Sequence, residues 1–65
     1  MLQINGKAVS FPEGLSLADY LRQEGYLLTL IAVEYNGAIL PKGRYETTLL
    51  TSGDSLEIVK FVGGG

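Results

Sequence analysis

Residues 55–65 read Ser-Leu-Glu-Ile-Val-Lys-Phe-Val-Gly-Gly-Gly, an apolar run that gives way to three glycines. The alternation of residue types predicts a strand over residues 55–62. One face of this strand carries Leu56 and Ile58, and the other carries Glu57, Val59 and Phe61. A Ser-Gly-Asp turn signal precedes it, so we take residues 55–62 as the last strand of a sheet.

The end of the chain consists of Gly63, Gly64 and Gly65. Glycine has no Cβ and adopts positive and negative φ alike, so such a run can pass through a channel too narrow for side chains. We expect residues 63–65 to form a flexible glycine tail behind a domain of residues 1–62. A terminal carboxylate becomes a reactive acyl group when a partner enzyme activates it. The alternative is a plain glycine-rich end without a role.

The start of the chain alternates apolar and polar residues around an Asn-Gly-Lys turn signal, which predicts a β-hairpin. Two turn registers compete. A turn at residues 5–6 places Ile4 opposite Lys7, whereas a turn at residues 6–7 places Ile4 opposite Val9. We favour the second register, because it gathers all four apolar side chains on one face. That face would hold Leu2, Ile4, Val9 and Phe11.

A short amphipathic helix is predicted to follow. Ser16 is suited to be its N-cap, and Gly25 suits the left-handed residue that commonly ends a helix. The apolar stripe between them consists of Leu17, Tyr20 and Leu21. This stripe needs a sheet to cover it.

The middle of the chain contains two more strand signals. Residues 28–35 are rich in β-branched and aromatic residues and predict a buried central strand. Residues 38–40 follow an Asn36-Gly37 turn and predict a short strand. Residues 42–50 have weak periodicity, so we expect irregular backbone there, with one helical turn near Tyr45.

This order of elements predicts an α+β domain. A mixed four- to five-stranded sheet with one helix packed across it buries the apolar faces of both layers. If the first and last strands are central neighbours, they run parallel, and the end of the chain leaves the sheet at a free end.

Composition and charge exclude several classes of protein. The 65 residues contain no cysteine and no histidine, so zinc sites, Ser/His/Asp triads and Cys/His pairs are excluded, and an enzyme is not expected. A net charge of -2 without a basic cluster is unlike a nucleic-acid binder. No apolar run approaches membrane-spanning length and no signal peptide opens the chain, so we expect a cytoplasmic protein without a membrane partner.

Specific stretches of the chain resemble the ThiS family, the ubiquitin-like sulfur carriers of bacterial thiazole (thiamine) biosynthesis. These stretches are Ile31-Ala32-Val33-Glu34-Tyr35-Asn36-Gly37, the Gly53-Asp54 turn and the end from Leu56 to Gly65. The order of elements and the length agree as well, so the resemblance covers the whole chain. It implies a β-grasp fold.

The resemblance also implies a chemistry. The functional residues of the family fall on Gly64 and Gly65, with Gly63 extending the run. A ThiF-like adenylyltransferase would adenylate the carboxylate of Gly65, a persulfide on a sulfur donor protein would convert it to a thiocarboxylate, and a ThiG-like thiazole synthase would receive the sulfur. ATP and its metal ion belong to the activating partner, so we expect this chain to bind no cofactor and to be a monomer when free. Because the chain has no cysteine, only its main-chain end could carry sulfur covalently.

Two further groups of residues lie on or beside the last strand. Val59 and Phe61 face away from the predicted core and could form an exposed apolar patch on which the activating enzyme docks, although burial within the sheet is the alternative. Asp54 and Glu57 could suggest an acid and a base. A turn residue beside an exposed strand residue is more typical of a structural role.

Three other functions stay open. The small subunit of molybdopterin synthase uses the same terminal thiocarboxylate, but its chains usually carry prolines before the glycines, where this chain has Phe61-Val62. A ubiquitin-like protein modifier would pass the activated acyl group to a lysine amine. A plain β-grasp interaction domain would use no terminal chemistry.

Overall fold

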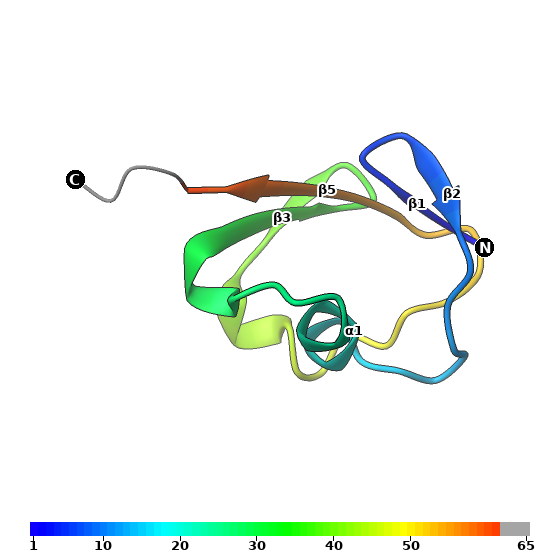
Figure 1. The fold of residues 1–65 in the computed structure, drawn as a ribbon, viewed down its shortest axis with the longest axis horizontal. Coiled ribbons are helices and arrows are strands. Elements are labelled where there is room, and N and C mark those ends of the chain that lie inside the picture. The colour runs from blue at the N-terminus through cyan, green and yellow to red at the C-terminus, as the bar shows by residue number, and fades with distance from the viewer. Residues whose placement is uncertain (62–65) are drawn as a thin grey trace.

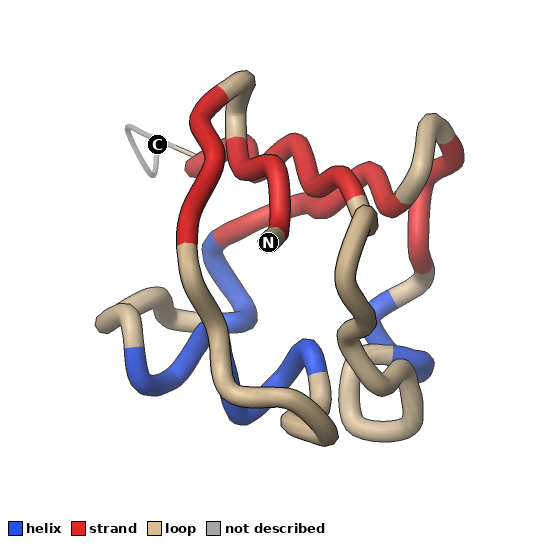
Figure 2. Tube along the Cα trace, turned by 90° about the vertical axis from the view of Figure 1, so that its right-hand side faces the viewer, coloured by secondary structure: helices blue, strands red, loops and turns tan. Residues whose placement is uncertain are grey.

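The computed structural model describes residues 1–61 as two layers, a sheet and a helical layer. The elements in chain order are β1 (Leu2–Ile4), β2 (Lys7–Val9), α1 (Leu17–Gln23), β3 (Ile31–Tyr35), β4 (Ala38–Leu40) and β5 (Ser55–Lys60), with 3₁₀ turns at Leu28–Leu30 and Lys42–Arg44. The strands form one layer, and α1 lies with the 3₁₀ turns and the long loops in the other (Figures 1 and 2). This confirms the predicted α+β architecture.

The sheet has five strands in the order β2-β1-β5-β3-β4. The last strand, β5, therefore lies in the centre. It pairs parallel with β1 and antiparallel with β3. The first and last strands are neighbours, and they run parallel, as expected for that case. Among the described residues, β5 lies between the β1–β2 hairpin and the β3–β4 hairpin in the sheet and pairs with both.

The register of the first hairpin differs from the prediction. Ile4 lies opposite Lys7, and the turn is Asn5-Gly6, with φ of 49° and 84°. The preference for a turn at residues 6–7 was wrong, because the amide of Asn5 makes bonds that the local pattern does not contain. Its Oδ1 accepts a hydrogen bond from the N–H of Ile58 (2.7 Å) and its Nδ2 donates to the carbonyl of Ile58 (3.3 Å). These bonds to β5 fix Asn5 in the turn.

The second hairpin repeats this arrangement. Its turn is Asn36-Gly37, as predicted, with φ of 51° and 88°. The Oδ1 of Asn36 accepts a hydrogen bond from the N–H of Ser55 (2.8 Å), at the start of β5. Each Asn-Gly turn therefore closes its own hairpin and also binds the backbone of the central strand.

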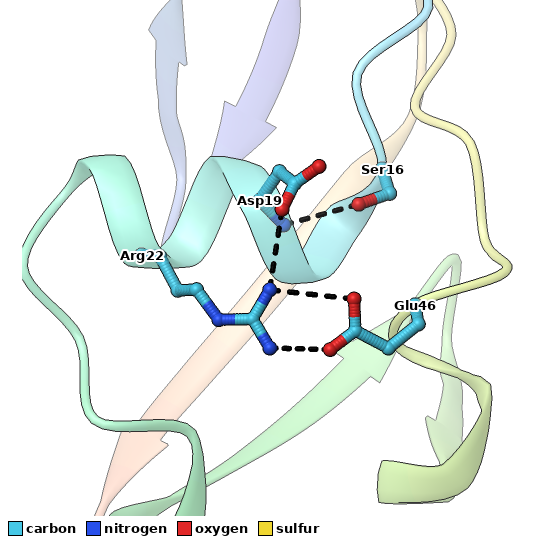
Figure 3. A network of polar contacts seen from close by, with 4 residues as sticks. All are labelled: Ser16, Asp19, Arg22 and Glu46. Carbon is cyan, nitrogen blue, oxygen red and sulfur yellow. Dashed lines mark hydrogen bonds and ion pairs between the residues drawn. The ribbon is translucent and has the colours of Figure 1, made fainter.

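The start of α1 is capped as predicted. The Oγ of Ser16 accepts a hydrogen bond from the N–H of Asp19 (3.1 Å), which satisfies a donor that the helix leaves free. Arg22 forms ion pairs with Asp19 and with Glu46 of the long loop before β5 (Figure 3). These exposed pairs link the helix to the loop beside it.

The end of α1 follows the predicted left-handed stop. Gly25 has a φ of 86°, which costs glycine little. Its N–H donates to the carbonyl of Arg22, and the N–H of Tyr26 donates to the carbonyl of Leu21, both at 3.0 Å. This is the Schellman pattern, and it directs the chain from the helix back toward the sheet.

The core lies between α1 and the sheet. Its buried apolar residues are Leu2, Leu17, Ala18, Tyr20, Leu21, Ile31, Val33, Tyr45, Leu50, Leu56 and Ile58. They include the whole predicted helix stripe and the inward face of β5. Full burial of a leucine contributes roughly 1.5–3 kcal/mol. Among residues 1–61, no helix has the length and apolar content needed to cross a membrane.

Two predicted strand boundaries need correction. The chain from Leu28 to Leu30 forms a 3₁₀ turn and not the start of β3, because it has to pass from the helical layer to the sheet within a few residues. β5 ends at Lys60, Phe61 lies just beyond it, and Val62 lies outside the described residues. The irregular segment before β5 contains the predicted single turn, at Lys42–Arg44.

Candidate functional site

The candidate site is the end of the sheet where β5 leaves it. Lys60 is paired with Ile31, and the N–H of Phe61 donates to the carbonyl of Leu30 (2.8 Å). The tip of β5 lies at the opposite end of the long axis from the N-terminus (Figure 1). The predicted reactive residues, Gly63–Gly65, lie outside the described residues, so their role stays a prediction.

The end of β5 carries an exposed apolar patch, which we define as Val59 and Phe61. Their exposed fractions are 56% and 55%. Val59 points away from α1 because it alternates with Ile58, which faces the core. Ile39 of β4 is also exposed, but it lies opposite Glu34 of β3, which separates it from β5. The patch therefore has the exposure that the docking hypothesis requires, while docking itself stays a prediction.

A groove that sequence reasoning missed lies beside the patch. It has a volume of about 210 Å³ and is lined by Gly25, Tyr26, Leu27, Leu30, Ile31, Lys60 and Phe61. Leu27 is 65% exposed and Leu30 is 49% exposed. The strand predicted over residues 28–35 placed Leu30 in a buried element, and Leu27 was assigned to no element. The available signal was the adjacent pair Leu27-Leu28, two residues after the helix stop. Adjacent residues cannot both face one core, and Leu28 packs against the core while Leu27 is exposed.

Two ammonium groups lie over aromatic rings at this end of the sheet. The Nζ of Lys60 lies 5.5 Å from the centroid of the Tyr26 ring. The Nζ of Lys42 lies 5.4 Å from the centroid of the Phe61 ring and donates to the carbonyl of Ile31. The end of β5 is thus apolar and locally positive in a chain whose net charge is -2.

Asp54 has a structural role, as the sequence favoured. It is buried, and its carboxylate accepts hydrogen bonds from the hydroxyl of Tyr35 (2.7 Å), the N–H of Thr51 (2.9 Å) and the side-chain amide of Asn36 (3.1 Å). Burial acts to raise the pKa of Asp54, but these bonds outweigh it and the pKa is lowered. The bond to Asp54, with burial, raises the pKa of Tyr35 to about 12. Glu57 is exposed on β5 and takes no part in these bonds.

The comparison with known protein families gives one decisive match. The model of the ThiS family matches residues 2–65. The chain belongs to the ThiS family. The sulfur carrier protein ThiS of Bacillus subtilis is 39% identical over 66 residues, and the match covers 100% of both proteins. The crystal structure of ThiS from Geobacter metallireducens has a TM-score of 0.75 at 30% identity, over 98% of this chain and 97% of that one. The β-grasp fold implied by the resemblance is confirmed.

A second kind of ThiS relative is much longer. The thiazole synthase of Paramagnetospirillum magneticum is 39% identical over 64 residues, which cover 98% of this chain. This chain spans 20% of the length of that relative. In that protein, a ThiS-like segment is part of the same polypeptide as the rest of a thiazole synthase.

Proposed function

We propose that this chain carries sulfur as a thiocarboxylate on Gly65 and delivers it for thiazole formation in thiamine biosynthesis. The observation that carries the proposal is the ThiS family match over residues 2–65, which includes the terminal glycines. The full-length match with the Bacillus sulfur carrier supports it. The central position of β5 also supports it, because the strand that leads to the glycines is held on both sides.

The chemistry proceeds in three steps. The carboxylate of Gly65 attacks the α-phosphate of ATP, releases pyrophosphate and becomes an acyl adenylate, a mixed anhydride with AMP as its leaving group. The terminal sulfur of a donor persulfide then attacks the carbonyl carbon, and AMP leaves. A thiol finally cleaves the resulting S–S bond, which leaves the thiocarboxylate and a new disulfide. The catalytic groups, ATP and its metal ion belong to a ThiF-like partner, and this chain supplies the reactant.

A ThiG-like thiazole synthase is the proposed acceptor. The Paramagnetospirillum relative supports this partner, since it joins a ThiS-like segment and a thiazole synthase in one chain. These matches also favour the thiazole branch over the molybdopterin alternative. Recovery of a large molybdopterin synthase subunit in place of thiazole synthase in a pull-down would overturn this choice.

The direct test is the intact mass of the protein after incubation with ATP, the activating enzyme and a persulfide source. Replacing one terminal oxygen by sulfur adds about sixteen mass units. A variant that lacks Gly64 and Gly65 is the matched control and should fold normally without gaining mass. An unchanged mass in the intact chain would refute the proposal. Higher-mass conjugates on a blot would instead indicate a protein modifier.

The apolar patch is the proposed docking surface for the activating enzyme. Val59→Asp and Phe61→Asp each place a charge on it and should slow adenylation while the protein stays folded. Leu49→Asp is the matched control, because Leu49 is 62% exposed but lies in the loop before β5. Adenylation of both patch variants at the rate of the control would exclude docking through this surface.

A further inference from the structure

We propose that Lys42 is a positioning residue for the reactive end of the chain, acting through Phe61. The proposal rests on the proposed function, because it assigns Lys42 a role in presenting that end to partner enzymes. Lys42 acts within the described residues 1–61. It holds the residue at which the chain leaves the sheet.

Two kinds of contact fix Phe61. Its N–H donates to the carbonyl of Leu30 (2.8 Å), which continues the pairing of β5 with the chain before β3. Its ring lies under the ammonium of Lys42, at 5.4 Å from Nζ to the ring centroid. A cation over a ring face is attracted by the negative charge of that face. The backbone and the ring of Phe61 are thus held separately, which limits rotation of the residue.

The ammonium of Lys42 is itself held in place. It donates a hydrogen bond to the carbonyl of Ile31, the first residue of β3. In the sheet order, β3 lies between β4 and β5, so Lys42 reaches from the end of β4 across the start of β3 to the end of β5. The ammonium of a residue that follows β4 therefore contacts both the start of β3 and the residue that follows β5.

The backbone of Lys42 is also held in place by hydrogen bonding. Lys42 opens the 3₁₀ turn after β4, and its carbonyl accepts a hydrogen bond from the N–H of Tyr45 (3.1 Å). Tyr45 is only 2% exposed and belongs to the core. The side chain of Lys42 therefore extends from a turn that the core anchors.

A fixed Phe61 reduces the number of directions in which the chain can leave the sheet. A partner enzyme that receives the chain end then has less conformational entropy to remove on binding. Loss of such a contribution raises KM and leaves kcat unchanged, because it acts on binding and not on the chemical step. The core is not involved, so stability should change little.

Lys60 provides a matched control. It carries the same charge at the same end of the sheet, and its Nζ lies over Tyr26 and not over Phe61. A general electrostatic effect on partners would make Lys42→Gln and Lys60→Gln equivalent. A positioning effect through Phe61 would raise KM in Lys42→Gln and not in Lys60→Gln. Lys42→Arg would keep the wild-type KM, because a guanidinium also stacks on an aromatic ring.

The experiment measures steady-state adenylation, as pyrophosphate release by a ThiF-like enzyme, for the wild-type chain and these variants. We expect Lys42→Gln to raise KM about three- to tenfold, with kcat within about twofold of wild type. Lys42→Arg should return KM to within about twofold of wild type, and Lys60→Gln should stay in that range. Equal values for the two glutamine variants, or no rescue by arginine, would overturn the proposal.

A readout independent of activity tests the contact itself. In the NMR spectrum, the ε-methylene protons of Lys42 should be shifted by the ring of Phe61, and Phe61→Leu should abolish the shift. The N–H of Phe61 should exchange faster in Lys42→Gln than in wild type. Absence of the shift would overturn the positioning role even if the chain is adenylated. If the chain is not adenylated at all while the shift is present, the sulfur-carrier function fails and not the contact.

Discussion

Replacing Asn5 separates two contributions that this residue makes to the central strand. Its side-chain amide forms two hydrogen bonds with the backbone of Ile58, and its own backbone has a φ of 49°. Asn5→Gly removes the amide but tolerates the positive φ. Asn5→Ala removes the amide and keeps a Cβ in the left-handed region, which alanine tolerates less well than asparagine or glycine, so the two variants differ in the cost of the backbone conformation.

The structure sets the expected magnitudes. Two hydrogen bonds of about 0.5–1.5 kcal/mol each predict that Asn5→Gly lowers the free energy of unfolding by about 1–3 kcal/mol. Asn5→Ala should cost roughly 1 kcal/mol more, because a left-handed backbone is unfavourable for alanine. A domain of this length has a total stability of about 3–10 kcal/mol, so either change should be easy to detect.

The assay is equilibrium unfolding in urea, followed by far-UV circular dichroism. Gln3→Ala is the matched control. Gln3 is an exposed residue of β1, the strand that directly precedes Asn5, and the loss of its side chain should change the free energy of unfolding by less than about 0.5 kcal/mol. If Asn5→Gly is as stable as this control, the amide bonds to Ile58 contribute nothing. Equal stability of Asn5→Gly and Asn5→Ala would show that the left-handed backbone at residue 5 carries no cost for alanine, against the prediction.

Three further changes have defined outcomes. Ser16→Ala removes the helix N-cap and should lower the free energy of unfolding by about 1 kcal/mol in urea titrations. Gly25→Ala adds a Cβ in open space at a φ of 86°, so it should cost about 1 kcal/mol through the backbone alone, and Gly25→Asn should cost less. The pKa of Asp54 is lowered by folding, so its carboxylate stabilises the protein above its ordinary pKa of 3.8, and this contribution is lost as the pH falls through the lower folded value. Between about pH 5 and about pH 2, the free energy of unfolding should therefore fall more steeply in the wild type than in Asp54→Asn.

The helix could be predicted because its signals are local. Ser16, the apolar stripe and Gly25 all lie within one short stretch, and each acts on its own backbone neighbours. The Asn36-Gly37 hairpin and the inward face of β5 were predicted for the same reason. These features depend on residue spacing, which the chain displays directly.

The first turn and the groove depend on contacts that are distant in sequence. Asn5 is fixed by Ile58, which lies 53 residues away. The spacing of apolar residues in the hairpin gives no information about that bond. The register with a turn at residues 6–7 was favoured from this spacing alone, and it was therefore wrong. The contact between Lys42 and Phe61 likewise joins an irregular segment to the end of a strand, so no local pattern could reveal it.

The exposure of Val59 and Phe61 was one of two alternatives that the sequence left open, and their surroundings were not predicted. Alternation along the strand is sufficient to assign a face. It does not show that Leu27 and Leu30 border the same end of the sheet, since residues 28–30 read equally well as strand or as a helical turn. Short apolar runs carry too little periodicity to separate these cases.

The order of strands in the sheet also has a consequence during synthesis. The ribosome produces β5 last, yet the two hairpins have no pairing with each other until β5 lies between them. A chain that stops before residue 55 consists of two separate ribbons without a shared sheet. Proteases and chaperones would therefore treat truncated copies as unfolded, and only copies that possess the strand leading to the glycines would reach the complete sheet.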